Sequence, residues 1–168
     1  MAMVEIKPFE INYQEEVITM ILDIQQGEFN IPITREQQPD LAQIDDFYRK
    51  GGGNFWLALH QGEVIGSIAL IHIGNRTGVI RKMFVKKEFR GKEKGVAKLL
   101  LDTLLTYSRN MELSDIYLGT VQPLVAAIRF YEKNGFERID KSDLPPTFPL
   151  IPIDTVFCHL KINNQDKI

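Results

Sequence analysis

Hydrophobic residues recur every three or four positions in three stretches of the chain, a spacing that lines one face of a helix. The first stretch starts at a capping-box pair, Asn12 and Glu15, and extends to about Gln26. The second covers about residues 40–49. The third begins at Gly95 and carries a broad apolar stripe: Val96, Ala97, Leu100, Leu101, Leu104 and Leu105. We therefore predict three helices, the last of them buried along one face.

Runs rich in Val, Ile, Phe and Trp follow the second helix and are typical of strands. They cover residues 54–59, 64–73 and 78–85, and short turn sequences separate them. This pattern predicts three antiparallel strands joined by hairpins. Three consecutive glycines, Gly51–Gly53, precede the first strand, and we interpret them as the end of the second helix.

The last third of the chain alternates short apolar runs with one more helical segment. Strands are predicted at 116–120, 136–139 and 155–162, and a helix is predicted at 124–134. A proline-rich connection, 145–152, joins the final two strands. Loops of this length often act as lids over a site.

This order of elements predicts one domain over residues 1–168 with an α/β (α+β) fold. A mixed, mostly antiparallel central sheet with helices on both faces satisfies the order. The condition is that the crossover through the third helix is right-handed and joins two parallel strands, a βαβ unit. The sequence contains no internal repeat and no linker that would mark a domain boundary.

Composition and charge narrow the classes of function. The chain is 44% hydrophobic, and its formal net charge of -2 gives no field that would attract nucleic acid or an anionic membrane. No stretch approaches the ~20 apolar residues of a membrane helix, and the first residues do not form a secretion signal. We expect a cytoplasmic protein without nucleic-acid or membrane partners, and a homodimer stays open. The single cysteine, Cys158, is interpreted as core filling, and no metal site is expected.

Residues 83–97 combine the end of a strand, a loop rich in lysine and glycine, and the start of the third helix. The first N–H groups of a helix lack internal acceptors and carry positive potential, so a phosphate binds there readily. Gly91 and Gly95 let the backbone approach an anion. Three basic side chains add charge: Arg90, Lys92 and Lys94. The spacings of a nucleotide P-loop and of a dinucleotide fingerprint are both absent.

The run from Arg90 to Leu100 resembles the acetyl-CoA pyrophosphate loop of the GNAT N-acetyltransferases, a glycine-rich loop before an apolar helix. The resemblance implies that acetyl-CoA is the co-substrate and that its pyrophosphate lies on this loop. Either Lys92 or Arg90 stands where the family motif has its first basic or amide residue. The residues that the resemblance assigns to cofactor binding here are Arg90, Gly91, Lys92, Glu93, Lys94, Gly95, Val96 and Ala97.

A second signature of the same family, A-x-x-x-Y-E-K-x-G-F, is similar to residues 127–136. It implies that Tyr131 is the acid that protonates the departing thiolate, since a phenol with an ordinary pKa near ~10 stays protonated at neutral pH. It also implies that Ala127 lies at the cofactor. The family usually has Asn seven positions before this tyrosine, where this chain has Leu124.

In this family the pantetheine arm of the cofactor hydrogen-bonds to the strand before the pyrophosphate loop. That strand corresponds here to Met83, Phe84 and Val85. A main-chain N–H on it would stabilise the oxyanion that forms during acyl transfer. Gly119 and Thr120, which end the partner strand, are expected on the opposite wall.

The resemblance implies transfer of an acetyl (acyl) group from acetyl-CoA to a primary amine by direct attack in a ternary complex. The sequence does not identify the acceptor, which is a small amine, an antibiotic, a peptide amino terminus or a lysine; segments 36–41 and 144–149 are expected at its pocket. The general base is a water chain or one of four residues: Glu28, Asp40, His60 or His72. The alternatives to an enzyme are a non-catalytic acyl-CoA sensor and an interaction domain.

Overall fold

The computed structural model describes residues 3–162, and the chain forms two compact units. The first unit consists of Met1–Ile71 and Arg81–Thr106, and the second of His72–Ile80 and Tyr107–Ile168. The chain passes from one unit to the other within strands and a helix, and not through linkers. The assignment of the whole chain to one domain stays a prediction.

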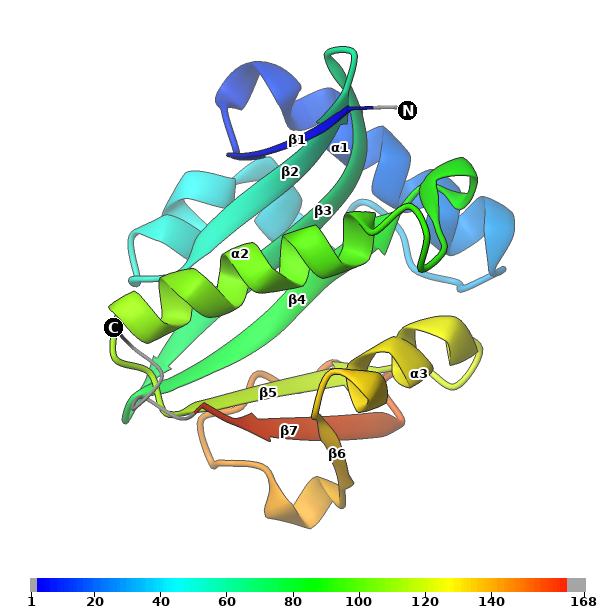
Figure 1. Cartoon of the computed structure of the whole chain (residues 1–168). Helices are drawn as coiled ribbons and strands as arrows, with labels where there is room; N and C mark the ends of the chain where they lie inside the picture. The colour runs from blue at the N-terminus through cyan, green and yellow to red at the C-terminus, as the bar shows by residue number, and fades with distance from the viewer. Residues whose placement is uncertain (1–2, 163–168) are drawn as a thin grey trace. The chain divides into compact units, whose positions relative to one another are not determined.

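The described residues contain seven strands and three α-helices (Figure 1). The strands are β1 (Val4–Pro8), β2 (Asn54–His60), β3 (Glu63–Gly74), β4 (Thr77–Val85), β5 (Asp115–Thr120), β6 (Glu137–Ile139) and β7 (Val156–Lys161). The α-helices are α1 (Gln14–Leu22), α2 (Val96–Asn110) and α3 (Val125–Lys133). The predicted strands and the last two predicted helices are thus confirmed, with shifts of one or two residues at their ends.

The strands follow the order β1-β2-β3-β4-β5-β7-β6. The pairs β1–β2, β2–β3, β5–β7 and β6–β7 are antiparallel, whereas β4 and β5 are parallel, with Thr77 opposite Asp115. Helix α2 connects the two parallel strands. The structure therefore confirms the predicted mixed, mostly antiparallel sheet with a βαβ crossover.

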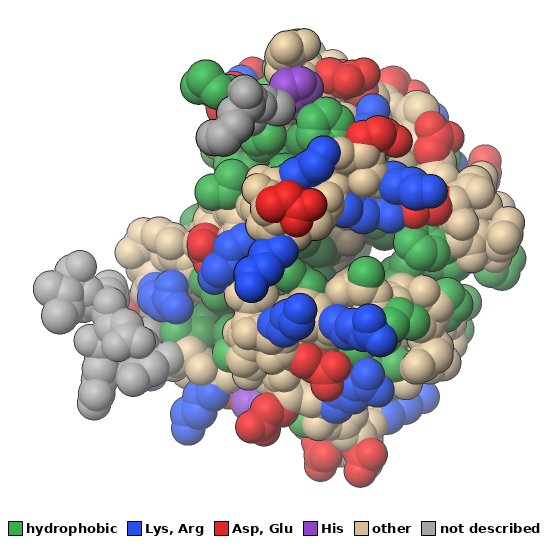
Figure 2. Space-filling view, turned by 45° about the vertical axis from the view of Figure 1, so that its right-hand side comes forward, with side chains coloured by type: hydrophobic (Ala, Val, Ile, Leu, Met, Phe, Trp, Pro, Cys, Tyr) green, Lys and Arg blue, Asp and Glu red, His purple; other side chains and the backbone are tan. Residues whose placement is uncertain are grey.

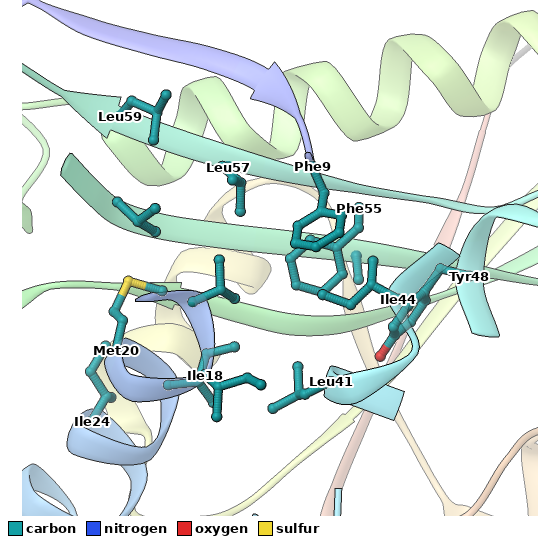
Figure 3. Close-up of a cluster of buried hydrophobic side chains, with 14 residues drawn as sticks. Phe9, Ile18, Met20, Ile24, Leu41, Ile44, Tyr48, Phe55, Leu57 and Leu59 are labelled. Atoms are coloured by element: carbon teal, nitrogen blue, oxygen red, sulfur yellow. The ribbon is translucent and has the colours of Figure 1, made fainter. Parts of the chain in front are cut away.

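In the first unit, α1 and α2 cover opposite faces of the sheet (Figure 1). Alternate residues of β2, including Phe55 and Leu57, join the apolar side chains of α1 in one buried cluster (Figure 3). On the other face, Gly66 of β3 lies so close to α2 that an added Cβ would be 3.2 Å from Leu100 Cδ1. One face of β2 thus packs on α1, and Gly66 of β3 leaves room for α2 on the other face of the sheet.

The start of α1 differs from the prediction. Tyr13 stands at the N-cap and no side chain caps the helix, so the predicted capping box is wrong. Glu15 instead accepts two hydrogen bonds of 2.9 Å from the guanidinium of Arg35, a partner distant in sequence. After α1 the chain continues as a wider π-helical turn, η2 (Asp23–Glu28).

The helix predicted over residues 40–49 is also wrong. Two short turns occupy this region: the 3₁₀ turn η3 (Pro39–Ala42) and the π-helical turn η4 (Asp45–Arg49). Asp40 is buried, and its carboxylate accepts a hydrogen bond of 2.5 Å from the hydroxyl of Tyr48. This buried contact between the two turns outweighs the helical preference of the segment between them.

The turn before β2 needs glycine for a reason that the sequence did not show. Gly52 has a φ of 98° and ends the helical turn, as predicted for this glycine run. At Gly53 an added Cβ would lie 1.9 Å from the carbonyl oxygen of Leu70 on β3. No side chain fits at that point of the β2–β3 pair.

In the second unit, α3 packs on the sheet formed by the first part of β4 with β5, β7 and β6 (Figure 1). Leu118 of β5 and Ile128 of α3 are buried, and Cys158 is fully buried as core filling, as predicted. The connection between β6 and β7 is fixed by Phe148, whose ring packs edge-on against Phe157 with centroids 6.1 Å apart. Its role as a lid stays a prediction.

Basic and acidic side chains are interspersed on the face shown in Figure 2. This distribution agrees with a formal net charge close to zero. None of the helices within residues 3–162 is long and apolar enough to cross a membrane.

Candidate functional site

A glycine-rich turn leads from β4 to α2 in the first unit. The carbonyl of Gly91 accepts hydrogen bonds from the N–H groups of Lys94 and Gly95, at 3.1 and 3.2 Å. Gly91 and Gly95 have φ values of 117° and 68°, a region that residues with a Cβ rarely adopt. The two glycines therefore make this tight turn possible.

The first N–H groups of α2 have no acceptor among the described residues. Leu99 is the first to bond backwards, to the carbonyl of Gly95 at 3.0 Å. Three N–H groups before it stay unpaired within residues 3–162: those of Val96, Ala97 and Lys98. Unpaired N–H groups and the helix dipole together favour an anion at such a helix start.

Arg90 is held by groups of the protein itself. Its two terminal nitrogens bind both carboxylate oxygens of Glu28, with Nη2 2.6 Å from Oε1, and its Nε donates to the carbonyl of Val85 at 2.7 Å. The guanidinium also lies over the ring of Phe29, 5.5 Å from its centroid. The hydrogen bond from Arg90 lowers the pKa of Glu28. Arg90 thus ties the loop to the segment around η2.

The two lysines of the loop differ in their surroundings. The Nζ of Lys94 donates to the carbonyl of Glu88 at 2.7 Å. Lys92 is exposed, and its side chain has no partner among residues 3–162. The carboxylate of Glu93 lies beside Gly91, 3.2 Å from the position of an added Cβ, and leaves the N–H groups of α2 unoccupied. Lys92 is therefore the basic side chain of this loop that can turn toward an anion.

The end of β4 lies directly before this turn. Met83 and Phe84 are partly buried, and Phe84 packs against the hydrophobic cluster of α1. Val85 is buried, and its carbonyl accepts from Arg90. The strand is irregular at Lys82, which has a φ of 53°. Irregular points of strands are common beside active sites, where they redirect side chains.

Tyr131 lies on α3 in the second unit and is 4% exposed. Its ring packs edge-on with Phe130 and Phe136, with centroids at 5.8 and 5.4 Å. Burial raises the pKa of the Tyr131 phenol, and the neighbouring thiol of Cys158 adds to the shift. Its hydroxyl has no hydrogen-bond partner within residues 3–162. It is therefore a protonated donor at neutral pH.

Gly119, Thr120 and Ala127 also belong to the second unit. Thr120 ends β5, and its carbonyl accepts a hydrogen bond of 2.9 Å from Thr155. An added Cβ at Gly119 would lie 2.7 Å from an oxygen of Asp154, so the backbone is closely covered there. Ala127 lies in the first turn of α3 and is partly buried. At the N-cap of this helix, Leu124 forms no side-chain hydrogen bond.

The four candidate bases are separated between the units. Glu28, Asp40 and His60 lie in the first unit, whereas His72 lies in the second. Glu28 is paired with Arg90, and Asp40 is buried. The Nδ1 of His60 lies 3.3 Å from the carbonyl oxygen of Met3. Among the described residues of the first unit, both candidate carboxylates, Glu28 and Asp40, are therefore already hydrogen-bonded.

Sequence reasoning missed a cluster of six polar residues in the first unit, most of them buried, which we call the bulge cluster. Its members are Gln25, Gln38, Asp40, Tyr48, Arg81 and Lys82. The amides of Gln25 and Gln38 bond to each other at 2.9 and 3.1 Å, and the Nζ of Lys82 lies 2.5 Å from Gln38 Oε1. The one sequence signal was a pair of adjacent cations inside an apolar strand, which a regular strand would place on opposite faces.

Comparisons with known proteins agree with this architecture. The profile of the acetyltransferase (GNAT) family matches residues 18–136. An acetyltransferase of the GNAT family from Staphylococcus aureus Mu50 is 38% identical, with a TM-score of 0.93 over 96% of this chain and 100% of that one. An acetyltransferase from Streptococcus agalactiae is 28% identical, with a TM-score of 0.91 over 95% of this chain and 98% of that one.

The curated relatives are matched over only part of their length. N-acetylaspartate synthetase of Danio rerio is 31% identical over 129 residues, which are 74% of this chain and 45% of that protein. The uncharacterized N-acetyltransferase YjgM of Escherichia coli is 32% identical over 105 residues, 61% of this chain and 62% of that protein. The chain thus spans less than two thirds of either relative. Since the family profile covers most of its length, the chain belongs to the acetyltransferase (GNAT) family.

Proposed function

We propose that this protein transfers an acetyl group from acetyl-CoA to a primary amine by direct attack in a ternary complex. The observation that carries the proposal is the row of unpaired N–H groups at the start of α2, behind a turn closed by Gly91 and Gly95. A phosphate group, such as those of the CoA pyrophosphate, is an anion that such a helix start binds readily. Membership of the acetyltransferase family supports the same assignment.

The pyrophosphate of acetyl-CoA is bound by main-chain N–H groups of Val96 and Ala97 and by the ammonium of Lys92. Arg90 positions the loop, because its guanidinium is engaged by Glu28 and by the carbonyl of Val85. Of the two basic residues that the sequence left open, the contacts therefore favour Lys92 as the phosphate ligand.

The reaction forms one C–N bond and breaks one C–S bond. The nitrogen of a neutral amine attacks the thioester carbonyl, and a main-chain N–H of the Met83–Val85 segment stabilises the oxyanion. The C–S bond then breaks, and its electron pair goes to the sulfur of CoA. Tyr131, which its raised pKa keeps protonated, donates its proton to that sulfur as the general acid, and water then returns a proton to the phenolate. The proton lost by the amine leaves through water, because no candidate base of the first unit has an unengaged carboxylate.

The test is release of CoA thiol by the purified full-length chain in the presence of acetyl-CoA and a panel of primary amines. We expect thiol release that requires both the protein and an amine, with the acetylated amine as the second product. Tight binding of CoA by calorimetry without thiol release from any amine would instead indicate an acyl-CoA sensor. Absence of both binding and release would indicate an interaction domain.

A further inference from the structure

Two adjacent cations, Arg81 and Lys82, stand at an irregular point of β4 in the first unit. Lys82 has a positive φ inside β4, and the buried hydroxyl of Ser67 donates to its carbonyl at 2.7 Å. The ammonium of Lys82 lies against Gln38. Burial raises the pKa of the Tyr48 phenol, and the positive charge of Arg81 opposes this rise. In a regular strand these two neighbours would face opposite sides.

The bulge cluster contains more positive than negative charge. Its one carboxylate, Asp40, accepts a hydrogen bond of 2.5 Å from Tyr48 and lies 3.7 Å from the Nζ of Lys82. The side chains of Lys82 and Asp40 are only 7% and 9% exposed. The guanidinium of Arg81 adds a second cation, so the cluster carries one positive charge in excess when all three groups are ionised.

The excess charge is localised at Arg81. Its Nη1 is buried and has no hydrogen-bond partner among residues 3–162. A buried guanidinium N–H without an acceptor is costly, whereas a carboxylate matches the guanidinium with two parallel hydrogen bonds. One bound carboxylate supplies both the missing acceptor and the missing negative charge.

We propose that Arg81 determines acceptor specificity by binding a carboxylate of the amine substrate, so that the acceptor is an amino acid or a related amine with a carboxylate. This inference rests on the proposed acetyl transfer. Arg81 stands two positions before Met83 on β4, which corresponds to at most about 7 Å along the chain, since the strand is irregular at Lys82 between them. A carboxylate and an amine that are separated by a few bonds span this distance. Phosphate is less suitable, because its second charge would exceed the single positive charge of the cluster.

The experiment compares matched acceptors with wild-type protein and two variants. Each L-amino acid is paired with its carboxamide and with the amine that lacks the carboxylate, and kcat/KM is measured by thiol release. For the wild type we expect kcat/KM to be about 100-fold higher for the amino acid than for its carboxamide or its decarboxylated amine. The analogues leave the guanidinium of Arg81 without its carboxylate partner. Arg81→Gln should reduce this preference to near unity by raising KM for the carboxylated acceptor alone. Arg81→Lys should retain part of it.

The controls separate specificity from folding. Arg138→Gln removes a half-exposed arginine of the second unit and should leave the preference unchanged. The KM for acetyl-CoA and the thermal unfolding midpoint of Arg81→Gln should match those of the wild type. An equal loss of kcat/KM for the carboxylate and for its carboxamide would overturn the inference, as would a wild-type preference for phosphoethanolamine over every amino acid.

A binding measurement keeps the inference testable if no amine is acetylated. In that case the proposed function fails, and calorimetry of amino acids with the CoA-bound protein is decisive. If an amino acid binds to the wild type and not to Arg81→Gln, the result would support the carboxylate subsite. If no amino acid binds, the subsite fails as well. If amines are acetylated equally well with and without a carboxylate, the subsite is refuted and the proposed acetyl transfer stands.

Discussion

Individual side chains around the α2 loop divide into groups that fix the loop and groups that face solvent. Arg90 binds Glu28 through two nitrogens and covers Phe29, so it acts as an anchor. Lys92 is unengaged in the described chain. This division was not available from the sequence, since Glu28 and Arg90 are 62 positions apart and nothing in a sequence motif marks such a pair.

Replacing Glu28 by Gln should lower the free energy of unfolding at pH 7 by roughly 1 kcal/mol, because it removes a partly buried, charge-assisted pair. Arg90 lowers the pKa of Glu28 in the folded state. The pair therefore stabilises the protein above the unfolded pKa of about 4.3, and this stabilisation is lost as pH falls through the lower folded pKa. Urea unfolding of both proteins from pH 7 to pH 3 should show the difference shrinking with acid.

The control is Glu15→Gln, which breaks a similar two-bonded pair with Arg35 at an exposed site. It should change stability less than Glu28→Gln, because solvent screens an exposed pair. A destabilisation by Glu28→Gln that stays constant between pH 7 and pH 3 would show that packing, and not the ion pair, is responsible.

Tyr131→Phe should lower kcat by about 100-fold, the order expected for loss of a positioned proton donor. Its affinity for CoA and its stability should stay close to wild type, because the hydroxyl has no partner among the described residues. Steady-state kinetics together with calorimetry of CoA measure the two effects. Tyr117→Phe, at another tyrosine of the second unit, is the matched control. Equal losses in kcat and in CoA affinity would make Tyr131 a binding residue.

Among the elements, α2 combines the clearest sequence signal with the clearest functional feature. Its apolar stripe predicted a long buried helix, and Leu100, Leu101 and Leu104 are fully buried. The turn before it was predicted to need glycine at Gly91 and Gly95, and both have a positive φ in the structure. Local signals such as periodicity and turn residues are sufficient here, because the helix and its turn depend on neighbouring positions in the sequence.

Gly95→Asp should weaken the affinity for CoA by at least about tenfold, because a carboxylate at this point opposes the pyrophosphate at the helix start. An added Cβ meets no atom within 4 Å, so the effect is not one of crowding. Gly95→Asn is the matched control, since Asn tolerates the same φ of 68° without a charge. It should bind CoA within a few-fold of wild type. Equal affinities for the two variants in calorimetry would contradict the placement of the pyrophosphate.

The N-terminal helices show where sequence reasoning fails. The capping box at Asn12 and Glu15 does not form, since Glu15 is bound by Arg35. The segment around Asp40 does not become a helix, since that carboxylate is buried against Tyr48. Both outcomes follow from contacts between distant residues, which outweigh local preference. The irregular backbone at Lys82 was not predictable either, because alternation along β4 gives no sign of a positive φ there.

For the whole molecule, the family assignment gives the fold, and the two units carry different parts of the proposed reaction. The unpaired N–H groups of α2 belong to the first unit, and Tyr131 belongs to the second. The fold was predictable because the order of elements admits few topologies once the crossover is right-handed. The acceptor was not predictable, since Arg81, the residue proposed to bind it, lies on an irregular strand that no motif describes.

The most direct test of the proposed function follows the acetyl group itself. The full chain is incubated with acetyl-CoA that carries carbon-13 in the acetyl group and with the amine panel, and the products are identified by mass spectrometry. We predict that the label appears on the nitrogen of an amine, at a rate that falls in Gly95→Asp and in Tyr131→Phe. Label that stays entirely on CoA, with a protein that binds CoA tightly, would contradict acetyl transfer as the function.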